Sequence, residues 1–135
     1  AASDVYKRQL AEPHQNPENF HVQMAGKDVY KYVMQKIPAV IKKTLEEANM
    51  TIDDIDYFIP HQANLRMIEA LTTRIKIAPE KVLHNIEHYG NMSATSIPCV
   101  ISEKIKSGEI KTPATVLLSA FGAGMTSAGA IIKIR

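Results

Sequence analysis

Apolar residues recur along this chain with a helical period in three places. From Asp28 they return every four positions, which predicts a helix to about Asn49. Asp28 can cap its start, and Pro38 inside it should remove one backbone hydrogen bond and bend it. The apolar positions that define this helix are Val29, Val33, Ile37, Ile41 and Leu45.

Two further helices are predicted nearer the C-terminus. Apolar residues from Leu65 to Ile75 indicate the second. The third begins at a cap, either Ser93 or Ser96, and ends at Gly108. Its inner face is expected to carry Val100, Ile101 and Ile105.

Between the helices lie short apolar runs that are typical of strands. The predicted strands cover 20–24, 56–60, 82–86, 115–120 and 128–134. The last strand follows the one before it too closely for a helical crossover and should be antiparallel to it. The pattern predicts an α/β domain with a mixed, mostly parallel five-stranded sheet and covering helices.

The first 18 residues differ from the rest of the chain. They are polar, contain Pro13 and Pro17, and show no clear period. We therefore interpret 1–18 as an N-terminal tail or connector and 19–135 as one domain.

The composition of the chain argues against nucleic-acid binding, a membrane span and an internal disulfide. The 135 residues carry a formal charge of +2 with Lys and Arg scattered, and aromatic residues make up 6%, so a nucleic-acid surface is not indicated. No apolar run is long enough to span a membrane. The single cysteine, Cys99, excludes an internal disulfide and favours a reducing cytoplasm.

Three polar or glycine-rich segments fall at or just after predicted strands: 61–64, 90–91 and 121–124. Ligands of such sheets bind beyond the carboxyl ends of the strands, so these segments can form one pocket. His61 and Asn91 both offer N–H donors that could stabilise an enolate or oxyanion there. From the residues alone a structural role for either side chain remains the more common alternative.

The wider motifs resemble a known family. Ile59-Pro60-His61-Gln62-Ala63-Asn64-Leu65-Arg66, Tyr89-Gly90-Asn91-Met92-Ser93-Ala94-Thr95-Ser96-Ile97-Pro98 and Leu117-Leu118-Ser119-Ala120-Phe121-Gly122-Ala123-Gly124-Met125-Thr126 resemble the histidine, asparagine and glycine-rich motifs of beta-ketoacyl-acyl carrier protein synthase III. Their order and spacing also match, and the resemblance covers about 20–135.

The resemblance implies a thiolase-like fold of two similar halves, of which this chain is the C-terminal one. It implies a decarboxylative Claisen condensation of acyl-CoA with malonyl-acyl carrier protein, which starts fatty acid synthesis. CoA and phosphopantetheine thioesters would be substrates, and no cofactor or metal is expected. Acyl carrier protein, acyl-CoA and a separate N-terminal half are the implied partners, with a homodimeric full-length enzyme.

The resemblance also assigns roles to residues. His61 and Asn91 would hold the malonyl thioester oxygen, and the loop of Gly122, Ala123 and Gly124 would help the acyl oxyanion. Arg66 would contact the carrier protein. The substrate-binding positions would be Gly26, Tyr30, Ala63, Asn64 and Phe121.

The sequence departs from the family at Ala123, where a second glycine is common, and at Met92, where threonine is common. Nothing in it matches the family's cysteine motif, so the acyl-carrying cysteine is expected outside this chain. Cys99 is interpreted as a small buried apolar residue.

Two alternatives stay open at this point. The chain could be a non-catalytic module that binds a carrier protein or CoA, or part of a related thiolase-fold enzyme that uses CoA substrates throughout. His84 and His88 are four apart, but without an obvious third ligand they do not indicate a metal site.

Overall fold

The computed structural model describes residues 25–135, so the predicted strand over 20–24 and the tail over 1–18 lie outside the described residues. The helices and strands in chain order are α2 (Gly26–Glu47), β1 (Tyr57–Pro60), α3 (Leu65–Ile75), α4 (Ile86–Tyr89), α5 (Ser96–Lys106), β2 (Ala114–Gly122) and β3 (Thr126–Ile134). Short 3-10 helices lie at Ile52–Asp54, Pro79–Lys81 and Ser93–Thr95.

The described residues form a three-stranded sheet in the order β1-β2-β3. β1 pairs with β2 in parallel, from Tyr57 opposite Val116 to Pro60 opposite Ser119. β3 returns antiparallel to β2, which confirms the predicted direction of the last strand. The sheet is mixed, as predicted. Its described part has three strands rather than five, and with one parallel and one antiparallel pairing it is not mostly parallel.

The strand predicted over 82–86 is wrong. Only Val82 forms a bridge, a single parallel one to Phe58, and α4 begins at Ile86. The ladder stops because the backbone N–H of Asn85 donates to the side chain of Gln62, at 3.2 Å, instead of to a strand. The side-chain oxygen of Gln62 thus takes the place of the backbone carbonyl that a neighbouring strand would have offered to Asn85.

The first two predicted helices are present. α2 continues through Pro38 and ends at Glu47, slightly earlier than predicted. Its N-cap is Ala25, and Asp28 lies inside its first turn, so the predicted Asp28 cap is wrong. α3 spans Leu65–Ile75 as predicted.

The third helix differs at its start. α5 begins at Ser96, its N-cap is Thr95, and no side chain caps it, so neither Ser93 nor Ser96 acts as the predicted cap. Val100 is buried as predicted, whereas Ile105 is 42% exposed and does not belong to the inner face.

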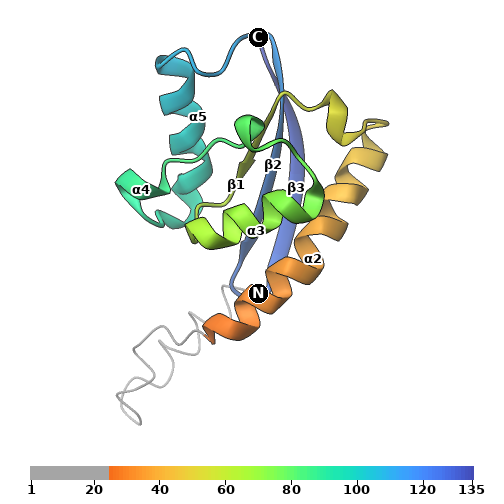
Figure 1. Cartoon of the computed structure of the whole chain (residues 1–135), viewed down its shortest axis with the longest axis vertical. Helices are drawn as coiled ribbons and strands as arrows, with labels where there is room; N and C mark the ends of the chain where they lie inside the picture. Colours follow the sequence, from red (N-terminus) through yellow and green to blue (C-terminus); the bar gives the residue numbers. More distant parts are fainter. Residues whose placement is uncertain (1–24) are drawn as a thin grey trace, which may run out of the picture.

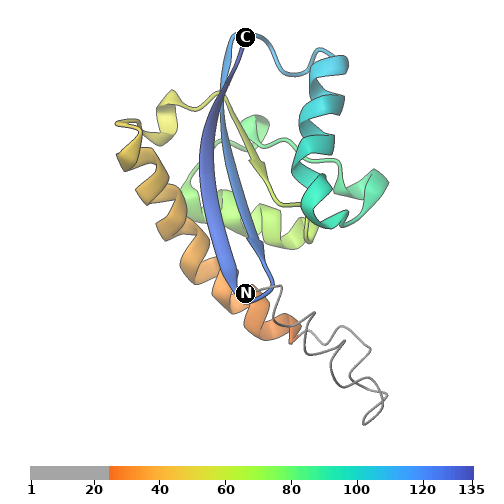
Figure 2. The same ribbon diagram turned by 180° about the vertical axis from the view of Figure 1, so that it is seen from behind.

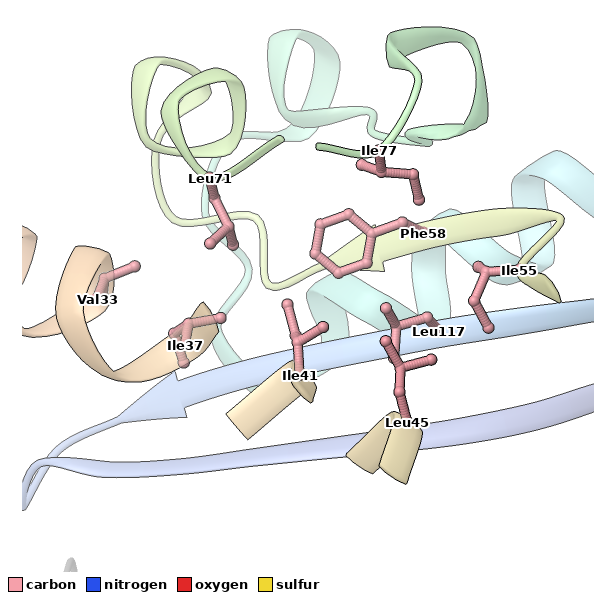
Figure 3. Packing of buried hydrophobic residues seen from close by; sticks show 9 residues of the cluster. All are labelled: Val33, Ile37, Ile41, Leu45, Ile55, Phe58, Leu71, Ile77 and Leu117. Carbon is pink, nitrogen blue, oxygen red and sulfur yellow. The ribbon is translucent and has the colours of Figure 1, made fainter. Parts of the chain in front are cut away.

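The helices cover the sheet from both sides (Figures 1 and 2). α2 and α3 pack on one face, where one apolar cluster joins Phe58 of β1 to Leu117 of β2 (Figure 3). The other buried members of this cluster are Val33, Ile37, Ile41, Leu45, Ile55, Leu71 and Ile77. A second cluster lies on the α5 face and contains Ile59, Leu83, Val100, Ile110, Ala114 and Val116.

α2 lies close against β3 at Gly129. A Cβ atom built on Gly129 would overlap Thr44 Oγ1 and lie 3.3 Å from Val40 Cγ1. Thr44 Oγ1 cannot turn away freely, because it donates to Val40 O at 2.9 Å. Glycine at 129 is therefore what allows the helix to lie against the strand.

We predict that Gly129→Ala lowers the free energy of unfolding by roughly 1–3 kcal/mol, because α2 must shift away from β3. Adding Thr44→Ala should restore part of this loss. Urea unfolding of the single and double variants measures both effects. Gly26→Ala, at the exposed start of α2 with open space around it, is the control and should change little. An unchanged Gly129→Ala protein would contradict the close contact.

Candidate functional site

A pocket of about 420 Å³ opens at the carboxyl ends of β1 and β2. It brings together four residues that the sequence singled out: His61, Asn91, Phe121 and Gly122. The remaining lining residues are Ser93, Ala94, Ser96, Ile97, Ala120, Thr126, Ser127 and Ala128. The three segments predicted to converge therefore meet in one place. For His61 and for Phe121 with Gly122 this follows from the adjacent carboxyl ends of the parallel strands β1 and β2, whereas Asn91 follows the short helix α4.

His61 is held by its backbone and by two contacts of its ring. Its backbone N–H donates to Ser119 O at 2.8 Å, which extends the β1–β2 ladder by one residue. The ring meets Phe121 edge-to-face, with centroids 5.2 Å apart and planes at 79°. Nδ1 of the ring lies 2.8 Å from Ser96 Oγ. These contacts leave the imidazole little freedom to rotate.

Burial lowers the pKa of His61 below its ordinary value, because the half-buried ring loses hydration that would stabilise the imidazolium. The ring is therefore neutral near pH 7. A neutral imidazole carries one N–H donor and one acceptor nitrogen.

Asn91 is oriented by a bond within its own loop. The backbone N–H of Ser93 donates to Asn91 Oδ1 at 2.8 Å. Because the oxygen of the amide faces this N–H, its NH₂ group is turned away and remains a donor. Gly90 precedes it with φ of 65° and ψ of −158°, a conformation that is essentially restricted to glycine.

The predicted oxyanion loop is only partly in the pocket. Gly122 lines it, whereas Ala123 and Gly124 are exposed and do not. Thr126 Oγ1 donates to Ala123 O at 3.4 Å across the turn. Phe121 and Gly122 are the last residues of β2 rather than the loop that the sequence predicted.

The other predicted substrate positions and Arg66 lie outside the pocket lining. Asn64 is the N-cap residue of α3, and Arg66 is exposed on that helix. Tyr30 is 43% exposed on α2. The first turns of α2 lie near the β2–β3 turn, because Tyr32 Oη donates to Met125 O at 3.3 Å. The remaining two, Gly26 and Ala63, are exposed and half-buried respectively.

Sequence reasoning missed a buried polar network behind the pocket. Gln62 is fully buried, donates through Nε2 to Pro60 O at 2.7 Å, and accepts the backbone N–H of Asn85 at 3.2 Å. Asn85 Nδ2 continues the network to Glu103 Oε2 at 2.9 Å. No sequence signal distinguishes these side chains from exposed ones, since the bonds that Asn85 makes to Gln62 and Glu103 join residues more than 15 positions apart.

Two pocket serines were also missed as site residues. Ser93 fixes Asn91 through its backbone, and the Asn-x-Ser spacing is a recognisable turn signal that could have predicted this. The sequence predicts Ser96 only as a helix cap, whereas in the structure it is buried against His61.

Metal-ligand clusters and membrane-spanning helices are both absent from the described part of the chain. Within residues 25–135 no group of three or more His, Cys, Asp or Glu side chains is placed to hold a metal ion. His84 Nδ1 instead contacts Glu87 Oε2 at 3.0 Å. No helix over the same residues is long and apolar enough to cross a membrane.

The lowered pKa of His61 predicts a pH-dependent stability. The unfolded chain binds a proton at this residue near pH 6.5, whereas the folded chain binds it only at lower pH. The His61 contribution is therefore lost as pH falls below about 6.5. Urea unfolding at pH 7.5 and 5.5 should show a smaller loss for His61→Gln than for the wild type. Equal losses would mean that His61 titrates normally.

The buried amide network predicts a stability effect for Gln62. Gln62→Met keeps the side-chain volume but leaves the Asn85 N–H and the Pro60 carbonyl without a partner. We expect a loss of about 1–3 kcal/mol in the free energy of unfolding, measured in urea. Gln35→Met, on the exposed face of α2, is the matched control and should be nearly neutral. Equal values for the two variants would refute the network.

Comparisons with known proteins agree with this geometry. Residues 45–134 match the family described as 3-oxoacyl-[acyl-carrier-protein (ACP)] synthase III C terminal. The chain is 45% identical over 112 residues to the beta-ketoacyl-[acyl-carrier-protein] synthase III of Porphyra umbilicalis, covering 83% of this chain and 34% of that protein.

Solved structures give the same result. The 3-oxoacyl-[acyl-carrier-protein] synthase III of Aquifex aeolicus VF5 superimposes with a TM-score of 0.79 at 37% identity, over 85% of this chain and 37% of that one. The synthase III of Thermus thermophilus gives 0.80 at 38% identity, over 84% and 35%. This chain spans about a third of the length of these relatives and has their thiolase-like α/β fold. By its matched residues and its fold, the chain belongs to the 3-oxoacyl-acyl carrier protein synthase III family and corresponds to the family's C-terminal part.

Proposed function

We propose that this chain supplies the enolate-stabilising donors of a condensing acyltransferase. The complete enzyme would join an acyl group from acyl-CoA to malonyl-acyl carrier protein and so start fatty acid synthesis. The observation that supports this most is the meeting of His61 and Asn91 in one pocket, at the carboxyl ends of two parallel strands. Family membership supports the choice of substrates.

The chemistry requires a place for negative charge. In the proposed step, the C–C bond to the malonyl carboxylate breaks, carbon dioxide leaves, and the bonding electrons pass to the thioester oxygen as an enolate. N–H donors from His61 and Asn91 stabilise this oxygen as its charge develops. The enolate carbon then attacks the acyl thioester on a cysteine, whose thiolate leaves when the C–S bond breaks.

The neutral protonation state of His61 suits a residue that donates a hydrogen bond without giving up its proton. Burial keeps the imidazole neutral, so the ring offers an N–H without carrying a positive charge into the pocket. Asn91 adds an amide N–H that does not titrate. Neither residue needs to transfer a proton, because enolate formation by decarboxylation moves none.

The other predicted roles are kept as parts of the same proposal. The backbone N–H groups of Gly122, Ala123 and Gly124 would serve the acyl oxyanion. The pantetheine arm would pass Gly26, Tyr30, Ala63, Asn64 and Phe121, and exposed Arg66 would meet the acidic carrier protein. The acyl-carrying cysteine would lie on an N-terminal half, in a homodimeric enzyme.

A complementation assay tests the proposal. The chain is combined with the part of the Porphyra umbilicalis relative that it does not match, which by the proposal carries the cysteine, and carbon dioxide release from malonyl-acyl carrier protein is measured. We expect release that His61→Ala and Asn91→Ala each reduce by about 10²–10³-fold, as for the loss of one oxyanion donor.

His88→Ala is the matched control, because it removes an exposed histidine outside the pocket and should leave the rate unchanged. Carrier-protein binding by the folded mixture without carbon dioxide release would reject the proposal in favour of a docking module.

A further inference from the structure

Ser96 lies directly behind the pocket histidine. It is fully buried at the start of α5. Its Oγ is 2.8 Å from His61 Nδ1 and accepts the backbone N–H of Gln62 at 3.4 Å. One serine hydroxyl thus contacts two consecutive residues of the segment that leaves β1.

The direction of the serine proton follows from counting donors. A hydroxyl has one proton and two acceptor sites, and a backbone N–H can only donate. Within residues 25–135, Ser96 Oγ forms hydrogen bonds with His61 and Gln62 alone. Its proton therefore points at Nδ1, since any other direction leaves a buried donor without an acceptor.

Helix α5 supports this assignment. The hydroxyl of a serine at a helix start usually accepts a hydrogen bond from a free backbone N–H group of the first turn. Here no side chain caps α5, and the Ser96 hydroxyl is directed out of the helix to the imidazole.

We propose that Ser96 is a positioning residue that keeps the proton of the neutral His61 ring on Nε2. With Nδ1 occupied as an acceptor, Nε2–H is the ring donor available to a ligand in the pocket. The edge-to-face contact with Phe121 restrains the ring from turning over and exchanging its nitrogens. That this donor serves a thioester oxygen rests on the proposed function, whereas the tautomer itself does not.

NMR of the ring nitrogens tests the proposal on this chain alone. The chain is labelled with ¹⁵N-histidine and measured at pH 8, and the His61 signals are identified by their loss in His61→Gln. We expect the Nε2–H tautomer to dominate by at least about ten to one, because the alternative leaves a buried hydroxyl unpaired. Magic-angle spinning gives the same readout if the chain self-associates.

Ser96→Ala should shift the His61 signals toward the averaged tautomer mixture of the exposed His88. Ser96→Cys, which keeps the shape with a weaker donor, should fall between the two and covers the case in which the alanine variant does not fold. Ser102→Ala, on the exposed face of α5, is the control and should leave the ratio unchanged.

A wild-type ring protonated on Nδ1 would overturn the proposal, as would a tautomer ratio that stays the same in folded Ser96→Ala and Ser96→Cys. Neither result bears on whether carbon dioxide is released in the complementation assay. The two proposals therefore fail separately.

Discussion

The parallel pairing of β1 with β2 determines where the pocket lies. The ladder ends with Pro60 opposite Ser119, and the Ser119 carbonyl then accepts the backbone N–H of His61. This bond carries the register one residue past the strand and places the imidazole beside the end of β2. Phe121 and Gly122 reach the same pocket because they are the last residues of that neighbouring strand.

A second constraint ties the Asn91 segment to the His61 segment. Residues 85–96 are joined at both ends to consecutive residues, through Asn85 to Gln62 and through Ser96 to His61. Asn91 lies between these two attachments, in an exposed stretch with few apolar contacts of its own. The two donors are therefore kept together by buried polar bonds, whose loss is costly in a low-dielectric interior.

How much the sequence predicted depends on the range of the interactions involved. The bounds of α3 and the antiparallel return of β3 follow from local patterns, and both predictions are confirmed. The strand over 82–86 failed because its backbone is satisfied by Gln62, more than 20 residues away. Ser96 was assigned to the wrong partner for the same reason, since local spacing cannot show a distant imidazole.

The position of Cys99 bears on whether this pocket could form a covalent acyl-enzyme or stabilise an oxyanion. It is the single cysteine of the sequence, and it lies on α5 with its Sγ 3.6 Å from Asn85 Nδ2, outside the lining of the pocket. A nucleophilic thiol would need both access to the substrate and a group that stabilises its thiolate. The pocket presents instead the N–H donors of His61 and Asn91, which in the proposed reaction would act on an oxygen that gains charge. The geometry of these residues therefore favours stabilising an oxyanion over forming a covalent acyl-enzyme at Cys99.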